Sequence, residues 1–211
     1  MKLYPKIPLG VERIDRLLQG GIPAGKTSVI YGPPSSGKTL IAIAATKTFT
    51  SRNGIAYYID TELKTAREYV VPAVYVEAVD ISRLLDTLLD ILKKARHVEP
   101  LLVVVDSISA VMHPLTINNP DYAGEKIRSL AHIARQLNQE NVTLLVALWH
   151  LGGYHGKYLN PALVIRSEKS YNGFRLVVEY GEDMPTPVEE LITIGEVISI
   201  ALARPFQTKE D

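Results

Sequence analysis

The chain contains no cysteine, which excludes a disulfide framework, a thiolate nucleophile and cysteine-type zinc sites. It also has no excess charge, because Lys and Arg together number 23 and Asp and Glu together number 23. A polyanion would therefore have to be attracted by a local patch. No apolar run approaches the ~18 residues of a membrane span, and residues 1–18 are too charged for a signal peptide. These absences predict a cytoplasmic protein with no membrane partner.

The apolar content is sufficient for a folded core. Hydrophobic residues make up 46% and charged residues 22% of the 211 residues, a composition typical of globular proteins rather than disordered ones. No linker, repeat or low-complexity segment interrupts the chain. Residues 1–211 are therefore predicted to form a single domain.

Short apolar strands alternate with helical patterns along most of the chain. Strands are predicted at 27–31, 55–59, 74–76, 101–105, 143–148, 162–167, 174–180 and 192–202, and helices at 38–51, 61–69, 82–95 and 121–138. Ser82 is the predicted N-cap of its helix. The run 101–105 is continuous, as expected of a central parallel strand covered on both faces. The pattern predicts an α/β fold, with a mostly parallel sheet flanked by helices and an antiparallel C-terminal extension.

Residues 32–39 match the GxxxxGK[ST] pattern of a phosphate-binding loop, directly after an apolar strand and at the start of a helix. Because the two prolines have no N–H, the amides of residues 35–39 are expected to cradle the phosphates at the helix N-terminus. Lys38 is predicted to reach the β- and γ-phosphates, and Thr39 to bind Mg²⁺. ATP and Mg²⁺ are the predicted cofactors. The predicted ATP-binding residues are Gly32, Pro33, Pro34, Ser35, Ser36, Gly37, Lys38 and Thr39.

Two carboxylates follow predicted strands of the same sheet. Asp106 ends the apolar run 101–105 in the form of a Walker B strand, which delivers a carboxylate to Mg²⁺, here through a water molecule. The alternative is a helix or turn cap. Glu62 follows the strand 55–59, where the alternative is a first-turn acid favoured by the helix dipole.

These residues, in this order, resemble the RecA/RadA recombinase superfamily. The segment 10–25 is similar to its TGxxxLDxLLGGGxxxG lead-in, residues 59–62 to its YIDTE, and residues 105–107 to its VDS. The chain looks like the RecA-like core of an archaeal RadA paralogue, or a RadB-like core. The resemblance implies the strand order 55–59, 101–105, 143–148, 27–31. It also implies that Glu62 orients the water attacking the γ-phosphate and acts with Lys38 in catalysis.

The chain departs from the superfamily at the end of the strand 143–148. The superfamily usually has Asn-Gln or a similar polar pair there, whereas this chain has Trp149 and His150. His150 is therefore a candidate phosphate sensor. Trp149 either stacks on a base or belongs to the core. The leader 1–8 has no Phe-x-x-Ala, so it shows no donor for the β-addition through which superfamily filaments usually form.

The segment 151–175 takes the place of the superfamily's second DNA loop, and it carries four cations against one acid. Such a local patch attracts nucleic acid without global basicity, and tyrosines there offer stacking faces. The alternative is an ordinary surface loop. The DNA-binding candidates are Tyr154, Lys157, Tyr158 and Arg175. Arg166 and Lys169 are candidates to act in trans on the phosphate of a neighbouring subunit.

Three functions remain open at this point. The first is a Mg²⁺-dependent ATPase that binds single-stranded DNA and assists homologous recombination or DNA repair, with a recombinase or repair protein as partner. The second is a non-hydrolysing accessory protein that ATP switches between conformations. The third is a KaiC-like signalling ATPase that does not act on DNA. Glu62 favours turnover, and the altered pair Trp149-His150 favours the second function.

Overall fold

The computed structural model describes residues 5–65, 67–95, 101–151, 158–182, 184 and 186–202. Its elements in chain order are β1 (Lys6–Ile7), α1 (Glu12–Leu17), β2 (Ile22–Pro23), β3 (Thr27–Tyr31), α2 (Lys38–Thr50), β4 (Ile55–Asp60), the 3-10 turn η1 (Arg67–Tyr69), β5 (Val74–Glu77), α3 (Ile81–Ala95), β6 (Leu101–Asp106), α4 (Ile108–Asn118), α5 (Pro120–Gln139), β7 (Thr143–Leu148), β8 (Leu163–Ser170), β9 (Gly173–Gly181), β10 (Val188–Thr193) and α7 (Ile194–Ala201).

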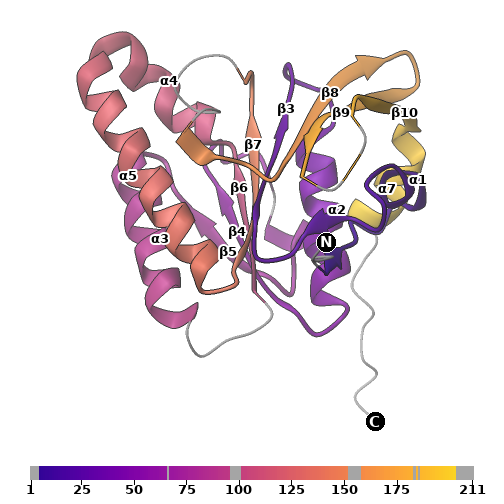
Figure 1. Cartoon of the computed structure of the whole chain (residues 1–211), viewed down its shortest axis with the longest axis horizontal. Helices are drawn as coiled ribbons and strands as arrows, with labels where there is room; N and C mark the ends of the chain where they lie inside the picture. The colour runs from indigo at the N-terminus through magenta and orange to yellow at the C-terminus, as the bar shows by residue number, and fades with distance from the viewer. Residues whose placement is uncertain are drawn as a thin grey trace.

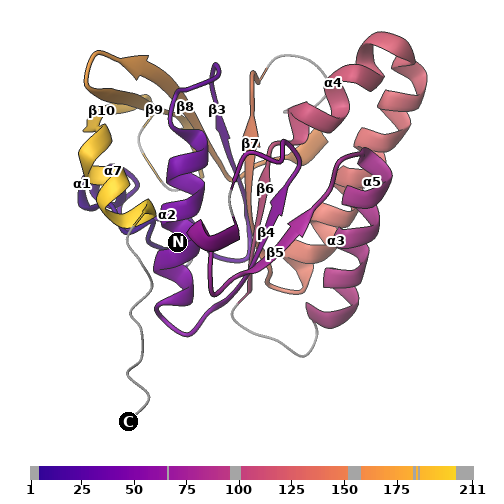
Figure 2. The ribbon, with the colours of Figure 1, turned by 180° about the vertical axis from the view of Figure 1, so that it is seen from behind.

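An eight-stranded sheet with the order β10-β9-β8-β3-β7-β6-β4-β5 divides the molecule into two halves. The helices α3, α4 and α5 cover one face, and α1, α2 and α7 cover the other (Figure 1). All neighbours from β8 to β5 pair in parallel, whereas β8, β9 and β10 pair antiparallel. The predicted α/β fold is thus confirmed, including the order β4-β6-β7-β3. β5 forms the outer edge beside α3, as the view from behind shows (Figure 2).

The strand β6 shows why the central sequence is continuously apolar. Leu102 and Val104 belong to the core cluster on the α2 side, and Leu101, Val103 and Val105 to the cluster on the α3 side. Successive side chains of a strand point to opposite faces, so a strand covered on both faces needs apolar residues at every position. This burial fixes the carboxyl end of β6, where Asp106 lies.

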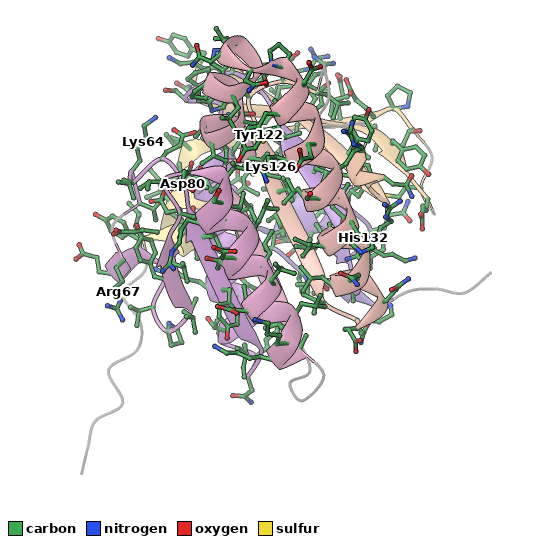
Figure 3. All side chains as sticks on the ribbon, turned by 90° about the vertical axis from the view of Figure 1, so that its left-hand side faces the viewer. Lys64, Arg67, Asp80, Tyr122, Lys126 and His132 are labelled. Carbon is green, nitrogen blue, oxygen red and sulfur yellow. The ribbon has the colours of Figure 1, made fainter. Side chains whose placement is uncertain are left out.

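Three predicted elements differ from the structure. The predicted helix 61–69 is wrong, because the Asp60 carboxylate accepts backbone N–H groups of the segment and folds it into a turn before η1. The helix α3 is capped by Asp80, which accepts a 2.8 Å hydrogen bond from the Arg83 N–H, and not by Ser82. Figure 3 labels Asp80 near the start of this helix.

The third difference concerns the predicted strand 192–202. Its β-branched residues are typical of a strand, but the chain turns into the helix α7 after Thr193. Thr193 and Glu196 form a capping box there, which supplies the local signal that overrides the strand propensity. The helix α4 was not predicted either. No helix among the described residues has the length and apolar character that crossing a membrane requires.

Candidate functional site

The predicted phosphate-binding loop connects the buried strand β3 to the helix α2 at the carboxyl edge of the sheet. Gly37, directly before α2, has a φ of +90°, a backbone conformation that residues with a Cβ rarely adopt. A Cβ at this position would also lie 2.6 Å from the ring of Phe174 on β9. The second glycine of the motif is therefore required both by the turn into α2 and by packing against β9.

The side chain of Lys38 lies against its own loop. Its ammonium donates hydrogen bonds to the carbonyl oxygens of Gly32, at 2.7 Å, and Pro33, at 2.8 Å. Burial lowers the pKa of Lys38, while the nearby charges of Asp106 and Glu62 act in the opposite direction. The loop, the lysine and both predicted carboxylates thus form one electrostatic site.

Asp106 and Thr39, the predicted magnesium residues, lie together. The Asp106 carboxylate accepts a 2.8 Å hydrogen bond from the Tyr58 hydroxyl and another from the Thr39 hydroxyl. Burial raises the pKa of Asp106, and these two hydrogen bonds oppose the rise. A hydroxyl and one carboxylate are a donor set that suits Mg²⁺, which takes its remaining ligands from water and phosphates. Among the described residues, no group of three or more His, Cys, Asp or Glu side chains could hold a metal by itself.

Glu62 lies just beyond the carboxyl end of β4, with its side chain 18% exposed. Its Oε1 atom accepts 2.9 Å hydrogen bonds from Ser107 Oγ and from Trp149 Nε1, and its Oε2 atom accepts one from Lys64. Burial works to raise the pKa of Glu62, but the three hydrogen bonds outweigh it and lower the pKa below its ordinary value. Glu62 is therefore held as a carboxylate beside Asp106.

Asp60 is a structural determinant of the site that the sequence analysis missed. Its Oδ1 accepts the backbone N–H groups of Glu62 and Leu63, at 2.9 and 2.8 Å, while Oδ2 accepts that of Thr65 at 2.8 Å and the Tyr75 hydroxyl at 3.1 Å. Only 1% of Asp60 is exposed. An aspartate ending an apolar strand and followed by polar residues is the signal that could have indicated such a turn.

Trp149 lies at the edge of the core rather than within it, and its stacking on a base stays a prediction. It is half-buried, its backbone N–H donates to Ser109 Oγ at 2.9 Å, and its ring lies 5.5 Å from that of His113. Its indole N–H is hydrogen bonded to Glu62, so the residue belongs to the site. His150 follows it with an exposed side chain, and its role as a phosphate sensor stays a prediction.

The predicted cations of β8 and β9 are mostly paired with acids. Arg166 contacts Glu168 and Glu179, and Arg175 contacts Glu168 and Glu189. Lys169 lines a cavity of about 480 Å³ that also reaches Ser35 of the phosphate-binding loop, Phe174 and Ile194. Lys169 thus lies beside the loop of its own chain. Its predicted action in trans, and that of Arg166, stay predictions.

The structure describes two of the four predicted DNA-binding residues, Tyr158 and Arg175. Tyr154 and Lys157 lie outside the described residues. Tyr158 is 38% exposed, which leaves part of its ring accessible. DNA binding by these residues and by Arg175 stays a prediction.

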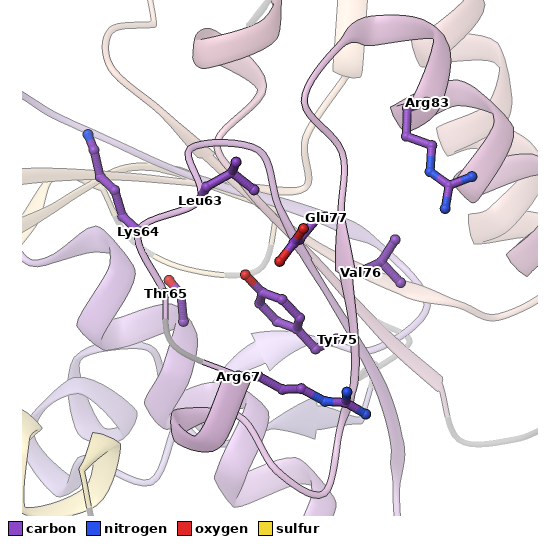
Figure 4. Close-up of a pocket in the computed structure, with 8 residues that line it drawn as sticks. All are labelled: Leu63, Lys64, Thr65, Arg67, Tyr75, Val76, Glu77 and Arg83. Carbon is purple, nitrogen blue, oxygen red and sulfur yellow. The ribbon is translucent and has the colours of Figure 1, made fainter.

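A larger cavity of about 790 Å³ lies beyond Glu62, at the carboxyl ends of β4 and β5. In Figure 4 the Tyr75 ring lies between Thr65 and Glu77 in this cavity. Burial and the nearby Asp60 raise the pKa of Tyr75 to about 12. The tyrosine therefore stays protonated at neutral pH and remains a donor to Asp60. Three cations also line the cavity: Lys64, Arg67 and Arg83.

The chain is similar in sequence to proteins named DNA repair and recombination protein RadB and Protein RecA. The chain is 31% identical to the DNA repair and recombination protein RadB of Halobacterium salinarum over 137 residues, 59% of this chain and 58% of that protein. It is 31% identical to Protein RecA of Symbiobacterium thermophilum over 226 residues, 97% of this chain and 63% of that protein. Protein RecA of Gloeothece citriformis is 36% identical over 118 residues, 50% of this chain and 31% of that protein.

The matched regions span less than two thirds of the length of these relatives. The sequence model of the RecA N-terminal domain family matches residues 6–143, which include the phosphate-binding loop, Glu62 and Asp106. Since this match covers more than half of the chain, the protein belongs to the RecA N-terminal domain family.

Proposed function

We propose that the protein is a Mg²⁺-dependent ATPase that binds single-stranded DNA and assists homologous recombination or DNA repair in the cytoplasm, as a RadA paralogue. The observation that carries the proposal is the convergence of four side chains at one edge of the sheet. The charges of Asp106 and Glu62 interact with the Lys38 ammonium and act to raise its pKa. Thr39 is hydrogen bonded to Asp106, and Glu62 is hydrogen bonded to Ser107, the residue after Asp106.

Each of these groups has a task in phosphoryl transfer. The amides of residues 35–39 bind the phosphates, and Lys38 leaves its own loop carbonyls to neutralise the β- and γ-phosphates. Thr39 directly, and Asp106 through water, would hold Mg²⁺, which would supply neutralising charge to the phosphate oxygens. Glu62 orients the attacking water and accepts its proton. Its lowered pKa keeps it ionised at neutral pH, as a base requires.

The DNA part of the proposal rests on the family and on the segment after β7. The relatives are named as DNA repair and recombination protein RadB and as Protein RecA. Because Arg166 and Arg175 are paired with acids, DNA phosphates must compete with those carboxylates for them. We therefore propose that DNA binding is weakened strongly by salt and involves the exposed Tyr158. A recombinase or repair protein is the proposed protein partner.

A non-hydrolysing, ATP-switched accessory protein is the second candidate function. The contact between Lys64 and Glu62 Oε2 favours it, since this ion pair occupies an oxygen that a catalytic base would need. The side chain of Lys64 is 73% exposed, however, and exposed ion pairs contribute only about 0–1 kcal/mol, so the pair opens readily. We therefore prefer the hydrolysing function.

The experiment that separates the candidates measures phosphate release from ATP with Mg²⁺, in the presence and absence of single-stranded DNA. The proposal predicts Mg²⁺-dependent release together with salt-sensitive DNA binding. ATP binding without release would support the accessory protein. Hydrolysis by a protein that does not bind DNA would support a KaiC-like signalling ATPase.

A further inference from the structure

We propose that Trp149 is a positioning residue for hydrolysis, whose indole N–H fixes one oxygen of Glu62 and leaves the other to accept the proton of the attacking water. This inference rests on the proposed ATPase function and assigns separate tasks to the two oxygens of a single carboxylate. Oε1 is the anchored oxygen, and Oε2 is the reacting oxygen.

The hydrogen bonds of Glu62 divide between its oxygens in this way. Oε1 accepts from Trp149 Nε1 and from Ser107 Oγ, both at 2.9 Å. A carboxylate oxygen offers about two lone-pair sites, so these two donors saturate Oε1. Oε2 is contacted by Lys64, whose side chain is 73% exposed and loses little on moving into water. Oε2 is therefore the oxygen that becomes available to a water molecule.

Trp149 is suited to this task because it is itself fixed. Its backbone N–H is bonded to Ser109 Oγ on α4, and its ring packs at 54° against the ring of His113 on the same helix. An indole has one donor and no acceptor, so it favours the ionised carboxylate and does not compete for its proton. Trp149 therefore fixes the carboxylate in one orientation and keeps it charged.

The hydrogen bonds of Glu62 connect the ends of three adjacent strands. Glu62 follows β4, Ser107 follows β6 and Trp149 follows β7, and these strands are adjacent in the order β4-β6-β7. Glu62 itself lies on a turn rather than on a regular element. A catalytic group on a turn needs such side-chain support, since a displacement of about 1 Å can cost about 100-fold in rate.

The kinetic test compares Trp149→Phe with the parent. Phenylalanine keeps an aromatic ring against His113 and removes the N–H donor. We expect kcat to fall about 10- to 100-fold while ATP affinity and KM stay within about twofold. His113→Ala is the comparison variant, because it removes one of the two contacts that hold Trp149 and keeps the indole donor, so its loss of kcat should be smaller than that of Trp149→Phe. Equal kcat values for Trp149→Phe and the parent, or equal losses in the two variants, would overturn the inference.

A spectroscopic test is independent of hydrolysis. Trp149 is the only tryptophan of the chain, so its indole gives a single N–H resonance in an ¹⁵N-labelled sample. Glu62→Ala should move the indole proton upfield, because the hydrogen bond to a carboxylate is lost, whereas Asp80→Ala should leave it in place. An unmoved resonance in Glu62→Ala would refute the contact. A parent protein without ATPase activity would instead refute the proposed function, so the two failures are distinguishable.

Discussion

Replacing Asp60 with alanine should destabilise the protein and abolish hydrolysis together, because this carboxylate holds the turn that carries Glu62. The substitution leaves the N–H groups of Glu62, Leu63 and Thr65 and the hydroxyl of Tyr75 without their acceptor. Asp60 is almost fully buried, so water cannot readily replace the lost carboxylate. The turn should therefore open or rearrange.

The loss in the free energy of unfolding can be worked out from the number of donors to Asp60 and from the burial of its carboxylate. Hydrogen bonds to a charged group contribute about 1.5–3 kcal/mol each, so four of them give a gross contribution of about 6–12 kcal/mol. Removing the charge also removes the cost of burying it, which is several kcal/mol and offsets part of this loss. The expected net loss in the free energy of unfolding is about 3–5 kcal/mol, because four neutral donors of a buried turn lose their acceptor.

Urea denaturation of the parent, Asp60→Ala and Asp80→Ala measures this difference. Asp80 is a matched control, because it is an exposed aspartate that accepts one backbone N–H at the start of α3. Its replacement should cost about 1 kcal/mol, the usual value of a helix cap. If Asp60→Ala loses no more stability than Asp80→Ala, or keeps the parent kcat, Asp60 does not organise the site.

The remaining predictions concern the charged groups. Lys38→Ala should weaken ATP binding in calorimetry and abolish hydrolysis, since only the amide cradle remains; parent-like turnover would contradict this. Burial raises the pKa of Asp106, so protonation favours the folded state, and parent stability falls as pH rises from 3.8 to the raised pKa. Asp106→Asn should therefore raise the neutral-pH melting temperature without Mg²⁺ while losing Mg²⁺-dependent hydrolysis, and a lower melting temperature would refute this. Because the Lys64 hydrogen bond helps lower the pKa of Glu62 in the nucleotide-free protein, the acidic limb of kcat/KM should lie below pH 4.5 and move upward in Lys64→Ala; an unmoved limb would exclude Glu62 as its origin.

The strand order and the position of the phosphate-binding loop could be predicted because their signals are local. The loop motif requires particular residues at consecutive positions, and the run 101–105 is apolar at every position because both faces of β6 are covered. Each carboxylate of interest follows such a strand. Parallel strands bring their carboxyl ends to one edge, so the topology placed Glu62 near Asp106.

The turn after β4 was missed because its residues also have a helical pattern, whereas the contact of Trp149 with Glu62 could not be predicted because it joins residues distant in sequence. Residues 61–69 have a helical pattern, but the Asp60 carboxylate accepts N–H groups that helical hydrogen bonds would otherwise use. The hydroxyl of Tyr75 on β5 donates a further hydrogen bond to this carboxylate. Trp149 is 87 residues from Glu62, and only the adjacency of β4, β6 and β7 brings them together. An aromatic residue at a strand end gives no sign of what its N–H contacts.

The most direct test of the central claim is phosphate release from ATP by the parent and by Glu62→Gln, each with Mg²⁺ and single-stranded DNA. Glutamine keeps the shape of the side chain and an acceptor for Ser107 and Trp149, but it has no negative charge to take the proton of water. We expect the parent to release phosphate, and Glu62→Gln to bind ATP with parent affinity and release none above background. Equal rates of release from the two proteins would contradict Glu62 as the catalytic base of an ATPase.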